Sequence, residues 1–239
     1  MIVLATDFGT GPYTAQLQSI FAQYLPGTPV ITLFDDLPRW DIKSSAYLLP
    51  AYTGGFPAES VFVVVVDPGV GSDRHGIVAQ IDGHWFVGPD NGVFEILIRR
   101  SQLTRCWFLD DKHGHISASF HGRDVFAPAA ADIALGHLPG DDTSVEPTRY
   151  GDWPEELYQC VYVDHFGNVL TGVRANGVSH QSTIVIKDQS IPYARTFSDV
   201  AIGESFWYEN SNGLIEIAVN QGKANELPGV NIGSHFDLL

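Results

Sequence analysis

The stretch VFVVVVDPGVGSDR, residues 61–74, decides the fold class of this chain. Its six apolar residues, 61–66, predict a strand buried on both faces, which is typical of a parallel sheet covered by helices. A proline and two glycines then predict turns. Turn chemistry does not require the carboxylate of Asp67 at the end of a buried strand, nor a guanidinium, Arg74, seven positions later.

The rest of the first half has the alternation that this strand implies. Apolar runs at residues 2–6 and 30–34 predict two further strands, and helical periodicity predicts helices at 13–25 and 41–52. Strands that alternate with helices indicate an α/β domain with a mainly parallel sheet. Further along, Asp82-Gly83 predicts the turn of a β-hairpin. A helix is expected at residues 93–100, and a loop that enters a helix is expected at 120–136.

The pattern changes after a stretch rich in proline, acids and glycine, residues 137–157, which is typical of a linker. The short apolar runs beyond it are separated by turns and indicate a small all-β domain. They occupy residues 158–164, 182–186, 205–208 and 214–219. We therefore expect an α/β domain at 1–152 and an all-β domain at 153–239.

Composition limits the classes of partner and compartment. The chain has 239 residues with 28 acids against 13 bases, a formal net charge of −15, and no basic cluster. The electrostatic field of this net negative charge repels nucleic acid but not a small cationic ligand. No apolar run reaches the roughly 18 residues of a membrane helix, and residues 1–5 lack the features of a signal peptide. We expect a cytoplasmic protein that binds neither membrane nor nucleic acid.

Cysteine and histidine spacing gives little support to a metal or a disulfide. Cys106 and Cys160 belong to no CxxC pair, so we expect two reduced, buried thiols. His113 and His115 follow two aspartates, a weak metal-ligand pattern that we interpret as a solvated loop. Both common nucleotide-binding fingerprints, GxGxxG after a strand and GxxxxGK[ST], are absent.

Three strands of the first half end in acids: Asp7, Asp35 and Asp67. Ligands of open α/β sheets bind beyond the carboxyl ends of the strands, so these carboxylates are candidate site residues. Arg74 can fold back through the glycine-rich loop onto Asp67, and such a pair would keep the carboxylate ionised and orient it. The alternative is that each aspartate only accepts bonds from loop amides.

Other candidate residues occur in loops. His121 lies in the glycine-containing loop FHGRD, 120–124, ahead of a helix, where either a functional or a structural histidine is common. The segments 164–168 and 210–213 are either plain β-turns or polar groups that bind a small ligand. Aromatic residues that could stack on a planar ring, or belong to the core, are Trp40, Phe166 and Phe197.

Several of these stretches together identify a family. In chain order they are TDFGTGPYTAQ, DLPRWDI, VVVVDPGVGSDR, WFVGPDNGVFE, SFHGRDVFAPAAADIALG, VYVDHFGNVLTG, TFSDVAIGE and NSNGLIEIAVN. The sequence resembles the S-adenosyl-L-methionine hydroxide adenosyltransferases, relatives of the fluorinases and chlorinases, over nearly its whole length. The most specific motifs are VDPGVG with its downstream arginine, GPDNG and FHGRD.

The resemblance implies an enzyme that splits S-adenosyl-L-methionine with water into adenosine and L-methionine. It implies a β-barrel-like C-terminal domain and a homotrimer whose sites lie between the N-terminal domain of one subunit and the C-terminal domain of the next. S-adenosyl-L-methionine is the substrate, and no metal or other cofactor is expected. Asp67, Arg74 and His121 match the family's water-activating set in type and setting.

The same resemblance assigns substrate contacts. It implies adenine or ribose neighbours at Trp40 and Phe166, contacts to the methionine part at Asp164, Asn168 and Ser211, and an adenine wall at Phe197 and Ala218. In many relatives an aspartate precedes the Pro-Tyr pair and holds the ribose hydroxyls. Here that residue is Gly11 in a loop one residue shorter, and Asp7 or backbone groups are left to bind the ribose.

Chemistry supports water as the nucleophile. The sulfonium makes C5′ electrophilic, whereas water must be oriented and partly deprotonated before it attacks. Which residue of the Asp67, Arg74 and His121 set takes the proton is open at this point. The alternatives are a halide-using adenosyltransferase, which the acid at Asp67 argues against, a non-catalytic S-adenosylmethionine or adenosine sensor, and a structural module without a ligand.

Overall fold

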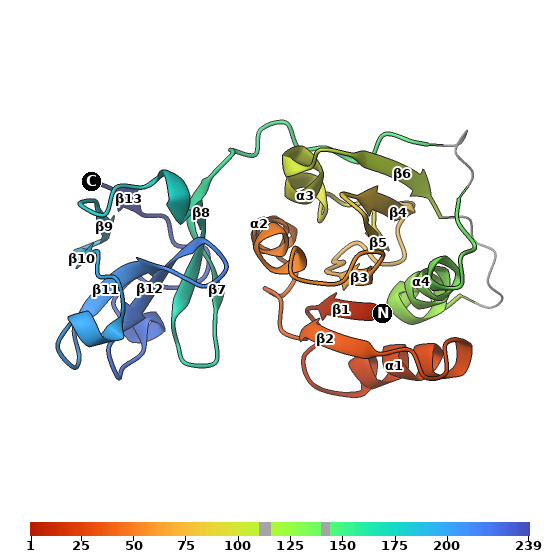
Figure 1. Cartoon of the computed structure of the whole chain (residues 1–239), viewed down its shortest axis with the longest axis horizontal. Helices are drawn as coiled ribbons and strands as arrows, with labels where there is room; N and C mark the ends of the chain where they lie inside the picture. The colour runs from red at the N-terminus through yellow and green to blue at the C-terminus, as the bar shows by residue number, and fades with distance from the viewer. Residues whose placement is uncertain (110–115, 140–143) are drawn as a thin grey trace. The chain divides into compact units, whose positions relative to one another are not determined.

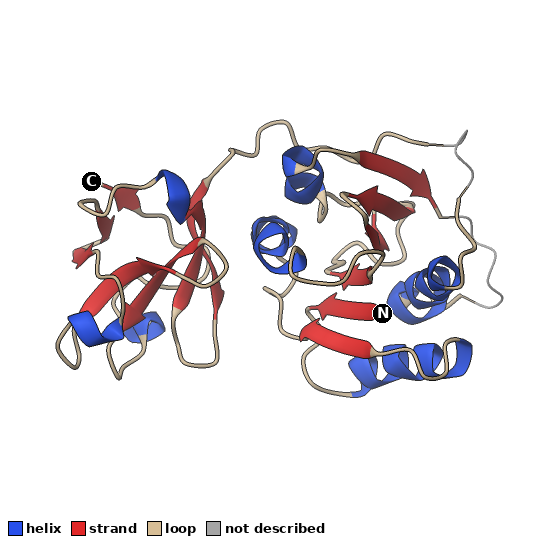
Figure 2. Cartoon of the chain, viewed as in Figure 1, coloured by secondary structure: helices blue, strands red, loops and turns tan. Residues whose placement is uncertain are grey.

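The computed structural model describes residues 1–109, 116–139 and 144–239. The chain divides into two compact units (Figure 1). The first unit comprises Met1–Ala46 and Thr53–Tyr150, and the second comprises Tyr47–Tyr52 and Gly151–Leu239. Figure 2 shows that helices are concentrated in the first unit and that strands dominate the second.

The first unit is built on one six-stranded sheet. Its strands, in spatial order, are β2 (Val30–Phe34), β1 (Ile2–Thr6), β3 (Val61–Val65), β5 (His84–Pro89), β4 (Gly76–Ile81) and β6 (Thr104–Phe108). The pairs β1–β2, β1–β3 and β3–β5 are parallel, and β4 is antiparallel to both neighbours. This confirms the predicted α/β domain with a mainly parallel sheet.

Helices cover both faces of that sheet, as the apolar strands predict (Figure 1). One face is covered by α1 (Pro12–Tyr24) and α4 (Ala127–Ala134), and the other by α2 (Ile42–Thr53) and α3 (Glu95–Arg100). Apolar side chains of α1 and α4 join those of β1, β3 and β5 in one buried cluster. Among the described helices, none combines the length and apolar character that crossing a membrane requires.

The predicted hairpin joins β4 to β5. Asp82 and Gly83 have φ angles of 47° and 86°, as a type I′ turn demands of its two central residues. The predicted segment 120–136 begins with a π-helical turn at Gly122–Phe126 and continues as α4. The hairpin explains why β4 interrupts the parallel order of the sheet.

The C-terminal part of the second unit is built of antiparallel sheets, as predicted, with only three short 3-10 turns between its strands; Tyr47–Tyr52 of α2 also belong to this unit. One antiparallel sheet has the order β11 (Ser205–Glu209), β12 (Leu214–Val219), β8 (Val169–Arg174) and β7 (Leu157–Val163). The other has the order β10 (Gln189–Pro192), β9 (Thr183–Ile186) and β13 (Asp237–Leu238). Strand β8 is missing from the predicted runs because Gly172 breaks its pattern; a Cβ there would lie 2.6 Å from the Cβ of Leu157 on β7.

The two cysteines are buried and form no disulfide, as predicted. Burial raises the pKa of Cys106 to about 11 and that of Cys160 to about 12. Both thiols are therefore protonated near neutral pH and behave as small apolar side chains.

Candidate functional site

Two of the three acids that end strands line one pocket of the first unit. Asp7 follows β1 and Asp67 follows β3, and these strands are neighbours in the sheet. The pocket has a volume of about 690 Å³. Asp35, which follows β2, does not line it and instead accepts a bond from the hydroxyl of Thr10. The parallel arrangement thus brings Asp7 and Asp67 to a common site.

Asp67 and Arg74 form a bidentate ion pair. Nε of Arg74 donates to Oδ1 of Asp67 at 2.9 Å, and Nη2 donates to Oδ2. The side chains are only 5% and 12% exposed, and the guanidinium lies over the ring of Phe126, 5.2 Å from its centroid. Gly71, with a φ of +81°, permits the turn that returns the chain. The pair leaves the carboxylate oriented, with further lone pairs on its oxygens.

His121 contacts the same guanidinium. Nη2 of Arg74 lies 3.0 Å from Nδ1 of His121, just ahead of the π-helical turn. A guanidinium only donates, so Nδ1 accepts and the proton of the neutral ring is on Nε2. In this arrangement the imidazole can donate a bond to a water molecule but has no nitrogen free to take a proton. The carboxylate of Asp67, by contrast, keeps lone pairs that can accept a proton.

Asp7 is a second acid of this pocket. Its Oδ2 accepts a bond of 3.0 Å from the backbone N–H of Trp40, whose φ of 60° is unusual for a bulky residue. Burial raises the pKa of Asp7, and the negative charge of Asp67 adds to that shift. Trp40 is 75% exposed and lines the pocket, whereas Gly11 does not line it.

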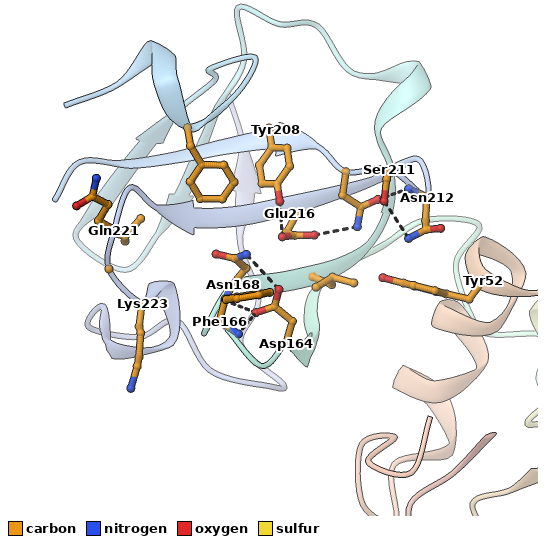
Figure 3. Close-up of a pocket in the computed structure, with 15 residues that line it drawn as sticks. Tyr52, Asp164, Phe166, Asn168, Tyr208, Ser211, Asn212, Glu216, Gln221 and Lys223 are labelled. Carbon is orange, nitrogen blue, oxygen red and sulfur yellow. Dashed lines mark hydrogen bonds between the residues drawn. The ribbon is translucent and has the colours of Figure 1, made fainter. Parts of the chain in front are cut away.

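The second unit has a pocket of about 850 Å³ on the β11-β12-β8-β7 sheet (Figure 3). Aromatic side chains flank it: Phe166 is 72% exposed, and Phe197 packs edge-on against Phe206 and Tyr208. Ser211 also lines the pocket. Ala218 does not line the pocket; it is fully buried and packs with Phe206.

Asp164 both forms a turn and lines this pocket. Its Oδ1 accepts bonds from the backbone N–H groups of Phe166 and Asn168, at 2.9 and 2.8 Å. Its Oδ2 accepts a bond of 3.1 Å from the side-chain amide of Asn168 (Figure 3). The turn interpretation and the site interpretation of residues 164–168 are therefore compatible, because the turn fixes the carboxylate at the pocket wall.

Glu216 is a pocket residue that the sequence reasoning missed. It is 5% exposed; its Oε1 accepts a bond from the hydroxyl of Tyr208, and its Oε2 accepts one of 2.9 Å from Asn210 (Figure 3). Burial raises the pKa of Glu216, and the charge of Asp164 adds to the shift. The available signal was an acid in the middle of the apolar strand LIEIAV, 214–219, every residue of which is buried.

Candidate metal ligands do not gather in the described part of the chain. Among residues 1–109, 116–139 and 144–239, no group of three or more His, Cys, Asp or Glu side chains could hold an ion. His113, His115 and the aspartates before them lie outside the described residues.

Comparison with known sequences identifies the family. The sequence profile of the SAM hydroxide adenosyltransferase N-terminal domain matches residues 2–142, and that of the C-terminal domain matches residues 158–237. This chain belongs to the SAM hydroxide adenosyltransferase family. The resemblance predicted from the motifs is confirmed.

Full-length relatives carry one name. A protein of Thermus thermophilus named (R)-S-adenosyl-L-methionine hydrolase is 34% identical over all of this chain and 99% of its own length. Relatives of the same name from Salinispora tropica and Methanocaldococcus jannaschii are 32% and 28% identical. The alignments cover 98% and 100% of this chain, and 96% and 95% of those proteins. The likeness to these SAM hydroxide adenosyltransferases thus extends through both units.

Solved structures share the fold. The crystal structure of a conserved Thermotoga maritima protein matches with a TM-score of 0.88 at 26% identity, covering 100% of this chain and 99% of that one. The crystal structure of a conserved Thermus thermophilus protein matches with a TM-score of 0.79 at 34% identity, with the same coverage.

Proposed function

We propose that this chain hydrolyses S-adenosyl-L-methionine by attack of water at C5′, which gives adenosine and L-methionine. The observation that carries the proposal is the Asp67 carboxylate held by Arg74, with His121 on the same guanidinium. Asp67 and His121 line a pocket of a chain whose full-length relatives are named (R)-S-adenosyl-L-methionine hydrolase.

The proposed reaction is a displacement at carbon. The water oxygen forms a bond to C5′ while the bond from C5′ to sulfur breaks, and its electron pair stays on sulfur as the neutral thioether of methionine. Asp67 takes the proton of the water, and the Nε2–H of His121 orients the water by donating to its oxygen. Arg74 holds both side chains. Because the leaving group departs uncharged, the reaction needs no metal and no other cofactor.

The second-unit pocket is proposed to bind the substrate. Phe166 and Phe197 offer faces for a planar adenine ring. Asp164 and Glu216 bring two carboxylates to the pocket, whereas Lys223 is 57% exposed and pairs with Glu226. A ligand that carries a sulfonium and an ammonium group complements this charge. Ser211 and Asn168 add polar contacts, as the resemblance implies.

We propose further that the protein acts as a homotrimer in the cytoplasm. The water-activating set belongs to the first unit and the aromatic, acidic pocket to the second. Neither pocket alone has all the groups that the reaction uses, which supports a site completed by a neighbouring subunit, as the family resemblance implies. The two unpaired cysteines are typical of a reducing compartment.

The proposal is tested by incubating the purified protein with S-adenosyl-L-methionine and following the products by liquid chromatography. We expect adenosine and methionine in equal amounts from the wild type, and almost none from Asp67→Asn, which keeps the shape of the side chain but cannot take the proton. Lys43→Gln, on α2 outside both pockets, serves as the control and keeps the wild-type rate.

Other outcomes would change the assignment. Tight binding of S-adenosyl-L-methionine or adenosine without release of methionine would instead support a sensor. A faster reaction with chloride or fluoride than with water would instead support a halide-using adenosyltransferase.

A further inference from the structure

The loop GPDNG, residues 88–92, lies against the strand that carries Asp67. It begins at the end of β5, next to β3 in the sheet. A Cβ added to Gly88 would lie 2.3 Å from the backbone oxygen of Val64, so no larger residue fits at this approach. The motif is among the most specific in the sequence, yet neither Asp90 nor Asn91 lines the pocket of Asp67. An influence of this loop on the pocket therefore has to pass through other residues.

Asn91 holds the chain immediately before Asp67. Its Nδ2 donates a bond of 2.9 Å to the backbone oxygen of Val66, a fully buried residue beyond the end of β3. Its Oδ1 accepts a bond of 3.2 Å from the N–H of Val93, which orients the amide. The side chain therefore anchors the peptide unit that leads into Asp67.

The same loop also holds the chain immediately after Arg74. The backbone N–H of Asp90 donates to the oxygen of His75 at 2.9 Å. That oxygen accepts a second bond, of 3.2 Å, from Nη1 of Arg74. The two ends of the segment 66–75 are thus attached to adjacent residues of one loop.

Between Asp67 and Arg74 the segment is held by short-range turns. The N–H of Val70 donates to Asp67, and that of Ser72 donates to Gly69. Residues 68–73 are all exposed. Such turns do not fix the position of Asp67 relative to the rest of the sheet, whereas the bonds from residues 90 and 91 do.

We propose that Asn91 is a positioning residue that holds the Asp67–Arg74 pair in the geometry needed to activate water. The inference rests on the proposed function, because it assigns Asn91 a part in the same reaction. Asn91 does not line the pocket of Asp67 and acts through the peptide of Val66. Its loss should lower kcat and leave substrate binding intact.

The primary test compares Asn91→Ala with the control Thr148→Val. Thr148 tethers the other side of the same loop, donating from its hydroxyl to Asp90 at 3.0 Å. Loss of fine positioning costs up to about 10²-fold in rate, so we expect kcat of Asn91→Ala to fall between about 10- and 100-fold. KM should stay within about twofold. Thr148→Val should keep the wild-type kcat.

A double-mutant cycle separates positioning from a general effect on the fold. If Asn91 acts through the pair, Asn91→Ala costs less than about twofold in an Arg74→Lys background, where the pair is already disturbed. Equal fold-losses in both backgrounds, or a normal kcat per folded molecule with only a lower Tm, would overturn the proposal. If Asn91→Ala does not fold, Asn91→Ser replaces it, since serine can still accept from Val93 but cannot reach Val66.

A measurement that does not depend on catalysis tests this inference separately from the proposed function. The ¹⁵N signal of Nδ1 of His121, assigned with His121→Gln, reports its bond from Arg74. We expect that signal to shift in Asn91→Ala and not in Thr148→Val; an unchanged signal contradicts the positioning role. If the wild type does not hydrolyse S-adenosyl-L-methionine, the proposed function fails whatever this signal shows.

Discussion

The carboxylates of the two pockets differ in the charge of their hydrogen-bond donors. In the first unit Asp67 accepts two bonds from a guanidinium, so that its charge is balanced within the protein. In the second unit Glu216 accepts bonds from a hydroxyl and an amide, and Asp164 accepts them from backbone and side-chain amides. Those donors are neutral, and the negative charge of the pocket remains available to a ligand.

The difference explains how one residue type serves two purposes. A carboxylate paired with arginine is held in one orientation, which suits a group that must align a water molecule. A carboxylate whose hydrogen-bond donors are neutral is well placed to attract a cation, since those donors carry no opposite charge. We therefore propose that the first pocket carries catalysis and that the second recognises the positive substrate.

The largest effect is expected from Asp67→Asn. The amide keeps the shape of the side chain but cannot take a proton, and general base catalysis typically contributes about 10²- to 10⁴-fold. We expect kcat to fall about 10³-fold with KM little changed, as measured by initial rates of methionine release. A kcat within tenfold of the wild type would contradict the proposal that the first pocket carries catalysis.

Glu216→Gln should show the opposite kinetic pattern. Removing one of the two uncompensated negative charges should weaken binding of cationic S-adenosyl-L-methionine about tenfold, since charged pairs contribute a few kcal/mol at most. Binding of neutral adenosine should change by less than about twofold. Isothermal titration calorimetry of both ligands tests this, with Glu209→Gln on the neighbouring strand, which does not line the pocket, as the control. Equal losses of affinity for both ligands would show that Glu216 does not recognise the positive charge of the substrate.

Mixing two inactive variants tests whether the pockets act across subunits. The first is Asp67→Asn and the second combines Asp164→Ala with Glu216→Gln. When the two are refolded together in equal amounts, about a quarter of the sites should pair an intact first unit with an intact second unit from another copy. We expect about a quarter of the wild-type activity. No recovery in a mixed trimer would place the whole site within one chain.

The smallest effect concerns stability and pH. Burial raises the pKa of Glu216 above its ordinary value of 4.5, so the folded protein holds this proton more tightly than the unfolded chain. The contribution of Glu216 is therefore fully favourable below pH 4.5 and is lost as the pH rises through the pKa of the folded state. Urea unfolding at several pH values should show this decline in the wild type and a flatter dependence in Glu216→Gln. Parallel curves for the two proteins would contradict it.

The sequence was more informative about the first pocket than about the second. Apolar strands that each end in an acid predicted the sheet and the meeting of Asp7 and Asp67, because the edge of a parallel sheet gathers strand ends. Asp35 is the exception: it does not line the pocket, and its carboxylate accepts a bond from Thr10. The guanidinium bond to His121 joins residues 47 positions apart, and only the family motifs pointed to it.

The second pocket depends on strand register, which local pattern does not specify. Glu216 faces the pocket because it lies opposite Tyr208 in the β11–β12 pairing. The missing prediction of β8, caused by Gly172, removed the strand that pairs with β12 on its other side. Without that strand, the acid in LIEIAV could not be placed on a particular face.

Hydrolysis in oxygen-18 water tests the central claim most directly. Mass spectrometry of the products should find one heavy oxygen in adenosine, at the 5′ position, and none in methionine. Asp67→Asn should form labelled adenosine about 10³-fold more slowly. Unlabelled adenosine, or an equal rate of labelling in Asp67→Asn, would contradict water attack at C5′ with Asp67 as the proton acceptor.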